Sequence, residues 1–349
     1  MLPKNLLVTG AAGFIASTFA AQRIEAGDTV IAYDKLTYAG HRENLDWIDN
    51  ADNRLQLVVD DICNRESVLE LLHKHEIDYV LNYAAESHVD NSISSPGEFV
   101  TTNINGTYAL LEAARTYYST LEGDKKDNFR FLHVSTDEVF GELGETGKFT
   151  EATPYRPNSP YSASKASSDL LVRAWHETYG LPTVITNCTN NYGPRQFPEK
   201  LIPATISRAL AGEPLKIYGN GTNIRDWIHV EDHNRGIWQA ITKGKVGETY
   251  CFGGNAEKNN IEVVNTICEI LDECHPRADG KSYKTQKTFV TDRAGHDFRY
   301  AIDDRKAQRD LGYRREFNFS GGIRATVRWY LDNQNWCDAV TNKNASNAA

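Results

Sequence analysis

The amino-acid sequence predicts an α/β fold in which helices cover both faces of a parallel sheet. Short apolar runs alternate with segments of helical periodicity, which is typical of strand–helix–strand units. The first unit carries a glycine-rich turn, and an acidic residue follows its second apolar run. These features predict a Rossmann-type doubly wound parallel sheet, joined to a smaller, mainly C-terminal α/β substrate domain.

The first unit contains a strand at 6–9, a helix at 14–25 and a strand at 29–33. The turn Gly10-Ala11-Ala12-Gly13 lets the backbone approach a pyrophosphate, which the helix N-terminus attracts. Asp34 lies 21 residues after Gly13, where a carboxylate can bind ribose hydroxyls and repels a 2′-phosphate. The unit therefore predicts a dinucleotide site that favours NAD over NADP.

The following segments continue the alternation, with strands at 55–59, 79–83 and 129–134 and a long helix at 103–118. Residues 123–128 are charged and contain a glycine, which predicts a surface loop. Asp61 and Ile62 follow the strand at 55–59 and could hold an adenine. A helix N-terminal acid is an equal alternative for Asp61.

Three polar residues follow the strand at 129–134 and form a candidate catalytic group. Thr136, Asp137 and Glu138 lie at the carboxyl end of this strand, which is the ligand-binding edge of a doubly wound sheet. Neighbouring carboxyl groups can divide acid and base work when burial and mutual repulsion separate their pKa values. A solvated turn is the alternative interpretation for an isolated Asp-Glu pair.

A second candidate group lies on a predicted helix at 160–178. Ser159 is suited to cap this helix and Pro160 to occupy its first position, so Tyr161 and Lys165 lie one turn apart on one face. A nearby ammonium lowers the pKa of a tyrosine and makes it a usable base. The Tyr-x-x-x-Lys spacing alone is common, and it gains meaning only beside a nucleotide-binding unit.

Composition limits the classes of partner. The 349 residues carry a net charge of -9 without a long basic run, which argues against nucleic acids and anionic membranes. Neither a membrane-spanning run nor a signal peptide is recognisable, and the six scattered cysteines indicate reduced thiols, with no metal site. We therefore expect a cytoplasmic protein. The polar end at 341–349 is expected to be disordered.

Nine stretches resemble one known family, the dTDP-glucose 4,6-dehydratases of the extended short-chain dehydrogenase/reductase superfamily. The resemblance covers residues 5 to about 335, and it depends most on Thr136-Asp137-Glu138, because related epimerases and dehydratases differ at the two carboxylate positions. The stretches are Thr9 to Ile15, Asp34 to Gly40, Ala84 to Asp90, Ser135 to Gly141, Tyr161 to Lys165, Asn187 to Pro194, Phe197 to Pro203, Ile224 to Trp227 and Asp292 to Asp297.

The resemblance implies a reaction and a role for each catalytic residue. dTDP-glucose would be oxidised at C4, lose water across C5 and C6 and take hydride back at C6, with NAD held tightly and regenerated. Tyr161, assisted by Lys165, would deprotonate the 4-hydroxyl, which Thr136 binds. Glu138 would remove the C5 proton and protonated Asp137 would release the 6-hydroxyl as water. The product, dTDP-4-keto-6-deoxyglucose, would feed deoxysugar synthesis such as that of rhamnose.

The resemblance also implies binding residues and a homodimer formed through the helices at 103–118 and 160–178. Contacts to NAD are expected from Gly10, Gly13, Phe14, Ile15, Asp34, Lys35, Leu36, Thr37, Gly40, Asp61, Ile62, Tyr83, Ala84, Ala85, Thr102, Tyr161, Lys165 and Asn191. Contacts to the sugar nucleotide are expected from Ser87, Thr136, Asn190, Glu199, Lys200, Leu201, Lys216, Tyr218, Arg225, Asn260, Arg293 and His296. Arg225 and Arg293 would form bidentate contacts with the diphosphate, and the alternative for each arginine is a surface ion pair. The alternative for Tyr218 is an ordinary, half-buried strand residue.

Two other functions share some of these features. A sugar-nucleotide 4-epimerase also uses NAD with a Tyr-Lys pair but needs no acid–base carboxylates, and a non-catalytic NAD sensor would be expected to lose Tyr161 or Lys165. We expect an NAD-binding domain at 1–186, to which later chain returns, and a substrate domain at 187–340. Positions that depart from the family pattern are Ala16, Asn91, Phe140, Arg195, Gln196 and Ala294.

Overall fold

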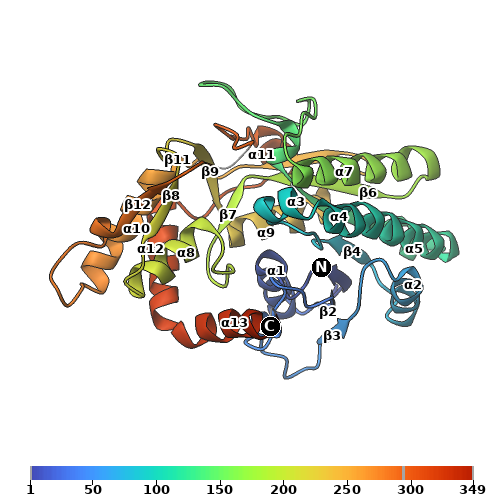
Figure 1. Ribbon diagram of the computed structural model, residues 1–349. Helices are drawn as coiled ribbons and strands as arrows, with labels where there is room; N and C mark the ends of the chain where they lie inside the picture. The colour runs from blue at the N-terminus through green and yellow to red at the C-terminus, as the bar shows by residue number, and fades with distance from the viewer. Residues whose placement is uncertain (1, 293–294, 348–349) are drawn as a thin grey trace.

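A parallel sheet forms the centre of the N-terminal part of the protein. The computed structural model describes residues 2–292 and 295–347, and within these residues the sheet has seven strands in the order β10-β6-β5-β4-β1-β2-β3 (Figure 1). The predicted fold class is confirmed. The strands are β1 (Asn5–Thr9), β2 (Thr29–Asp34), β3 (Leu55–Val59), β4 (Tyr79–Asn82), β5 (Arg130–Thr136), β6 (Thr183–Cys188) and β10 (Thr249–Phe252).

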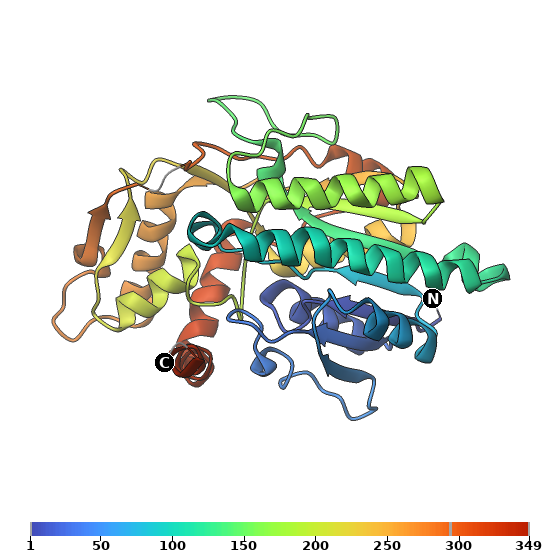
Figure 2. The ribbon, with the colours of Figure 1, turned by 45° about the vertical axis from the view of Figure 1, so that its right-hand side comes forward.

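Helices pack against both faces of this sheet. Side chains alternate along β1, so Leu6 and Val8 enter one hydrophobic core whereas Leu7 enters the other. The first core is covered by α1 (Phe14–Glu25), α9 (Val230–Lys243) and α11 (Arg305–Leu311). The second is covered by α2 (Arg65–Lys74), α5 (Thr107–Thr120) and α7 (Pro160–Tyr179), and Figure 2 shows α5 and α7 side by side.

The second domain has its own core between three helices and two small sheets. Its helices are α8 (Leu201–Leu210), α10 (Asn260–Cys274) and α12 (Phe319–Asp332), and α13 (Gln334–Asn347) follows. One sheet joins β11 (Glu257–Asn259), β9 (Ile224–His229) and β7 (Asn190–Tyr192), and the other joins β12 (Lys287–Val290) and β8 (Leu215–Tyr218). Because β10 pairs with β6 after the chain has left the first domain, we propose interleaved domains that separate near residue 187.

Short helices complete the chain, and some differ from the prediction. Residues 123–128, which were expected to form a loop, form the exposed helix α6 (Gly123–Asn128). The long helix that was expected to begin at residue 103 is preceded by the π-helical segment η2 (Val100–Gly106), and α5 follows it. Residues 341–347, expected to be disordered, continue α13, whereas 348–349 lie outside the described residues. The remaining helical turns are η1 (Arg42–Asn44), α3 (Val89–Ser94), α4 (Pro96–Phe99), η3 (Asp137–Phe140) and η4 (Tyr283–Gln286). Among the described helices, none is both long and apolar enough to span a membrane.

Candidate active site

A pocket of about 330 Å³ lies at the carboxyl edge of the central sheet. The residues that follow β1 to β6 line it together with Gln196, Phe197, Glu199 and Lys200, so both domains form its wall. Every residue expected to contact NAD lines this pocket except Leu36. Residues that were not expected as contacts also line it, namely Ala16, Tyr33, Tyr38, Ala39, Asp60, Glu86, Val134, Ser135, Cys188, Thr189, Gln196 and Phe197.

The glycine turn packs directly against the end of β4. Gly10 has φ +64°, and a Cβ atom there would lie 2.8 Å from the backbone nitrogen of Ala84, so a larger residue would separate the two segments. Gly13 precedes α1 without a side-chain cap, which leaves the first amides of the helix facing the pocket region. This geometry fits a dinucleotide pyrophosphate.

Asp34 has a different immediate role from the one expected. Its Oδ2 atom accepts a hydrogen bond from the Ala12 amide at 2.9 Å, and its Oδ1 atom accepts one from the Leu36 amide at 2.7 Å. The carboxylate therefore fixes the glycine turn, and its ribose contact remains a proposal. Lys35 forms an ion pair with Asp61, 2.8 Å between Nζ and Oδ2, at the same wall.

The candidate acid and base follow β5 in the 3₁₀ turn η3. Thr136 caps this turn, because its Oγ1 atom accepts a hydrogen bond from the Glu138 amide at 3.3 Å. Glu138 lines the pocket, whereas Asp137 is only 2% exposed and is not itself a lining residue. Burial, followed by the neighbouring Glu138 carboxylate, raises the pKa of Asp137 well above its usual range. This direction suits a carboxyl group that must carry a proton.

Tyr161 and Lys165 enter the pocket from the first turns of α7. The predicted start of this helix is confirmed, since Ser159 and Ser162 form a reciprocal capping box and Pro160 is the first helical residue. The net shift of the Tyr161 pKa is upward, opposite to the lowering expected from a nearby ammonium alone. Burial, followed by the Glu138 charge, raises the pKa of Tyr161, and Lys165 directs its Nζ atom to the Val134 carbonyl at 2.8 Å.

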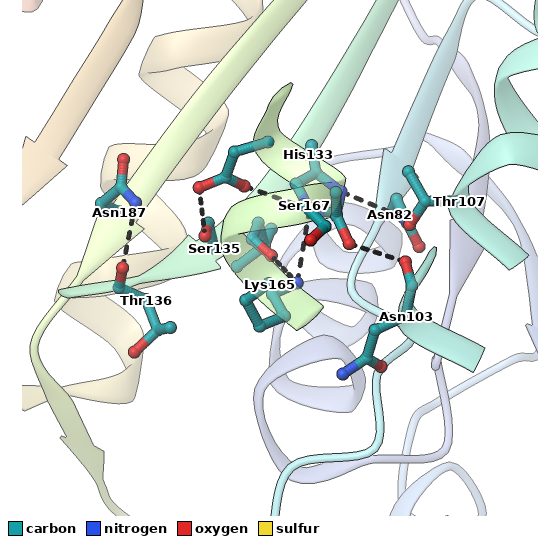
Figure 3. Close-up of polar contacts among 12 residues, drawn as sticks. Asn82, Asn103, Thr107, His133, Ser135, Thr136, Lys165, Ser167 and Asn187 are labelled. Carbon is teal, nitrogen blue, oxygen red and sulfur yellow. Dashed lines mark hydrogen bonds and ion pairs between the residues drawn. The ribbon is translucent and has the colours of Figure 1, made fainter. Parts of the chain in front are cut away.

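A buried polar network lies behind Lys165 (Figure 3). Its Nζ atom is 3.3 Å from Nε2 of His133, whose Nδ1 atom is 3.1 Å from the amide nitrogen of Asn82. The Asn82 carbonyl oxygen accepts the Thr9 hydroxyl at 2.7 Å, so its amide group donates to His133. Nδ1 of His133 therefore accepts this bond, and its Nε2 atom lies near both the Lys165 Nζ atom and the Asp169 carboxylate. Burial holds the pKa of His133 well below its usual value, so the ring is neutral.

Asp169 completes this network one turn after Lys165. Its Oδ2 atom accepts hydrogen bonds from Ser135 at 2.8 Å and Tyr155 at 3.0 Å, and its Oδ1 atom lies 3.5 Å from Nε2 of His133. Burial raises the pKa of Asp169 to about 6 and lowers that of Lys165 to about 8, while each charge opposes the shift of the other. The sequence interpretation missed His133 and Asp169, although the i, i+4 spacing on α7 was available for Asp169.

The residues expected to bind the sugar nucleotide divide into two groups. Ser87, Thr136, Asn190, Glu199 and Lys200 line the pocket, and Lys200 donates to the Ser87 carbonyl at 3.2 Å. Other residues do not line it, namely Leu201, Lys216, Tyr218, Arg225, Asn260 and His296. Arg293 and the departing position Ala294 lie outside the described residues.

Arg225 is not the surface ion pair that the sequence left open as an alternative, and its contact with a diphosphate stays a prediction. It is only 6% exposed, and its NH2 group donates to the Asp297 carbonyl at 3.0 Å while the guanidinium stacks 4.3 Å from the centre of the Tyr300 ring. The side chain is thus neither a surface ion pair nor part of the pocket wall. Tyr218 and Lys216 share the exposed face of β8, and the Tyr218 ring lies edge-on to His296 at 6.3 Å.

Comparison with known proteins agrees with this geometry. The sequence model of a family described as GDP-mannose 4,6 dehydratase matches residues 7–326. A relative from Xanthomonas campestris pv. campestris, named dTDP-glucose 4,6-dehydratase, is 56% identical over 335 residues, which are 96% of this chain and 95% of the relative. The chain belongs to the dTDP-glucose 4,6-dehydratase family. The predicted family is therefore confirmed.

Solved structures distinguish the dehydratase family from its neighbours. The crystal structure of the dTDP-glucose 4,6-dehydratase from Streptomyces venezuelae, with NAD and TYD bound, has a TM-score of 0.87 and 43% identity and covers 96% of this chain and 99% of its own. The UDP-glucose 4-epimerase from Thermotoga maritima has a TM-score of 0.83 but only 27% identity, over 95% of this chain and 99% of its own. The epimerase thus shares the fold, whereas the higher identity lies with the dTDP-glucose 4,6-dehydratase.

Proposed function

We propose that this chain converts dTDP-glucose to dTDP-4-keto-6-deoxyglucose and water. The single observation that carries this proposal is the convergence of two groups on one pocket. Thr136 and Glu138 line it at the end of β5, with the buried Asp137 between them in the sequence, and Tyr161 and Lys165 line it from α7. A 4-epimerase needs only the Tyr-Lys group. The carboxyl pair is explained by an elimination of water, which requires an acid and a base.

The cofactor of the proposed reaction is NAD, whose site is the glycine turn with Asp34, Lys35 and Asp61. When bound there, NAD would supply the hydride acceptor for C4 and the hydride donor for C6. The positive charge of Lys165 offsets the cost of forming a buried phenolate at Tyr161, which takes the proton of the 4-hydroxyl. Thr136 holds that oxygen with its hydroxyl group.

The elimination uses the two neighbouring carboxyl groups in opposite protonation states. The 4-ketone acidifies the proton at C5, and Glu138, which lines the pocket, removes it. Asp137, whose pKa is raised by burial, donates its proton to the departing 6-hydroxyl. Its Oδ2 atom is buried and has no hydrogen-bond partner among the described residues, which fits a group reserved for the substrate.

The proposed reaction is tested by incubating the purified protein with dTDP-glucose without added cofactor. We expect a product lighter by one water, which would also show that NAD remains bound during purification. If a C4 epimer of unchanged mass formed instead, or no product formed with NAD supplied, the proposal would be wrong.

We further propose that the protein is a cytoplasmic homodimer. Large apolar side chains lie exposed on the outer faces of α5 and α7, including Tyr108 (49%), Leu170 (59%) and Tyr179 (51%), and a second copy would cover them. The described cysteines are free thiols, which suits the reducing cytoplasm. A monomeric mass in light scattering at micromolar concentration would contradict the dimer.

A further inference from the structure

Two loops from different domains face each other across the pocket. Residues 37–40 follow β2 and line it from the first domain, whereas Gln196 and Phe197 line it from the second. The ring of Phe197 stacks on His41 at 5.2 Å and meets Tyr38 edge-on at 6.3 Å. The wall of the dinucleotide site therefore depends on how these two loops are held together.

Arg195 lies immediately before this contact and bridges three parts of the chain. Its guanidinium carbon is 3.7 Å from the ring centre of Trp47, beyond β2 in the first domain, and 5.0 Å from that of Trp329 on α12. Burial lowers the pKa of Arg195 to about 10, so the side chain is still a cation at neutral pH. It is thus a cation held between two aromatic faces.

The backbone at Arg195 is unusual. This residue has φ +67°, a left-handed conformation that residues with a side chain rarely adopt. The segment is held on both sides, because the Gln196 carbonyl accepts the Tyr330 hydroxyl at 2.6 Å and the Gln196 side chain donates to the Asn191 carbonyl at 3.0 Å. Such a conformation persists where surrounding contacts fix it, and it directs Arg195 toward Trp47.

Trp47 is connected to the glycine turn through Asn44. The Trp47 indole donates to the Asn44 carbonyl at 2.8 Å, and the Asn44 side chain donates to the Ala12 carbonyl at 2.8 Å. The Trp336 indole on α13 donates to the Asn44 side chain at 3.1 Å, so the C-terminal helix also reaches this loop (Figure 1). A contact at Trp47 is therefore two hydrogen bonds away from the turn that would hold the pyrophosphate.

We propose that Arg195 is a positioning residue that closes the 37–47 loop over bound NAD by clamping Trp47 against Trp329. The inference rests on the proposed function, because a redox-neutral reaction needs the cofactor to remain in place between its two hydride transfers. Arg195 acts through Trp47 and the glycine turn, and it need not touch the cofactor. It also gives a structural meaning to one of the positions that depart from the family pattern.

The test is the rate at which bound NAD leaves the protein. Radiolabelled NAD is loaded onto the wild type and onto Arg195→Ala, Trp47→Ala and the double variant, and its loss is followed during a chase with unlabelled NAD. From the usual strength of cation–π contacts we expect each single variant to release NAD about 2- to 30-fold faster. The double variant should be no faster than the more affected single variant, because both remove one contact.

Arg328→Ala is the matched control, since Arg328 is exposed on α12 next to Trp329. It should release NAD at the wild-type rate. Arg195→Lys provides a second test if Arg195→Ala folds poorly, because the lysine keeps the charge but loses the planar stack, and its release should also be faster than that of the wild type. Wild-type release rates in both Arg195 variants, additive effects of Arg195 and Trp47, or a wild type that retains no NAD would each overturn the inference.

Product formation from dTDP-glucose by the wild type at saturating NAD is measured in the same preparation. If the wild type forms no product while the variants still release NAD faster, the proposed reaction fails and the clamp stands. If product forms but the release rates are equal, the clamp fails and the reaction stands.

Discussion

Replacing Asp137 with asparagine separates the acid from the rest of the site. The amide has nearly the same shape as the carboxyl group but cannot donate an acidic proton. Asp137 is only 2% exposed, and burial and the Glu138 charge both keep it protonated, so the substitution changes its chemistry without removing a charge from the protein. Hydride removal from C4, with Tyr161 as the base for the 4-hydroxyl, and proton removal at C5 by Glu138 should therefore continue. The loss of water should not.

The expected loss follows from the usual contribution of a positioned acid. A general acid accelerates its step by about 10²- to 10⁴-fold, which corresponds to about 2.7–5.4 kcal/mol of transition-state stabilisation. We expect elimination by Asp137→Asn to slow by this factor. Reduced cofactor should accumulate, because the hydride taken from C4 has no acceptor at C6 until water has left.

The assay is a rapid-quench experiment in deuterium oxide. Absorbance at 340 nm follows the reduced cofactor, and mass spectrometry separates deuterium uptake at C5 from loss of water. With the Asp137→Asn variant, the sugar should gain deuterium at C5 before it loses water. Elimination at the wild-type rate would refute the assignment of Asp137 as the acid, and loss of C5 exchange together with elimination would show that the substitution had disabled the base instead.

The other predictions concern the base, the first oxidation and the buried charges. Glu138→Gln should abolish deuterium exchange at C5 while hydride removal from C4 persists; exchange at the wild-type rate would contradict its role. Tyr161→Phe should slow the first oxidation, measured as cofactor reduction in a single turnover, by about 10²- to 10⁴-fold, and a near-normal rate would remove Tyr161 from the mechanism. Activity should fall below about pH 6, as Asp169 becomes protonated, and above about pH 8, as Lys165 loses its proton. Because the Asp169 carboxylate raises the pKa of Lys165, Asp169→Asn should remove the acid limb of the pH–rate profile and move the alkaline limb to lower pH; an unchanged profile would exclude this coupling.

Local patterns predicted the parts of the protein that depend on local physics. The helix start at Ser159 and Pro160 is confirmed because capping uses residues adjacent in the sequence. The strand before Thr136 is also confirmed, since its apolar run is buried in the centre of the sheet. The same reasoning placed the candidate catalytic residues at the carboxyl edge, where Thr136, Glu138, Tyr161 and Lys165 meet.

Features that depend on distant segments could not be predicted in this way. The direction of the pKa shift of Tyr161 depends on burial by several elements, which the spacing to Lys165 does not reveal. The contact of Lys165 with His133 requires the packing of α7 on β5, and the contact of His133 with Asn82 requires the pairing of β5 with β4. Arg195 meets Trp47 only because the two domains lie against each other. Arg225 likewise donates hydrogen bonds to backbone carbonyl groups of residues 297 and 298, which no local sequence pattern indicates.

In the proposed reaction, one hydride moves from C4 to C6 of the same sugar while water leaves. Substrate carrying deuterium at C4 tests this claim most directly, with the position of the label read by NMR after turnover in ordinary water. We expect deuterium to be retained in the product at C6. Deuterium lost to the solvent, or returned to C4 in an epimer without loss of water, would contradict it.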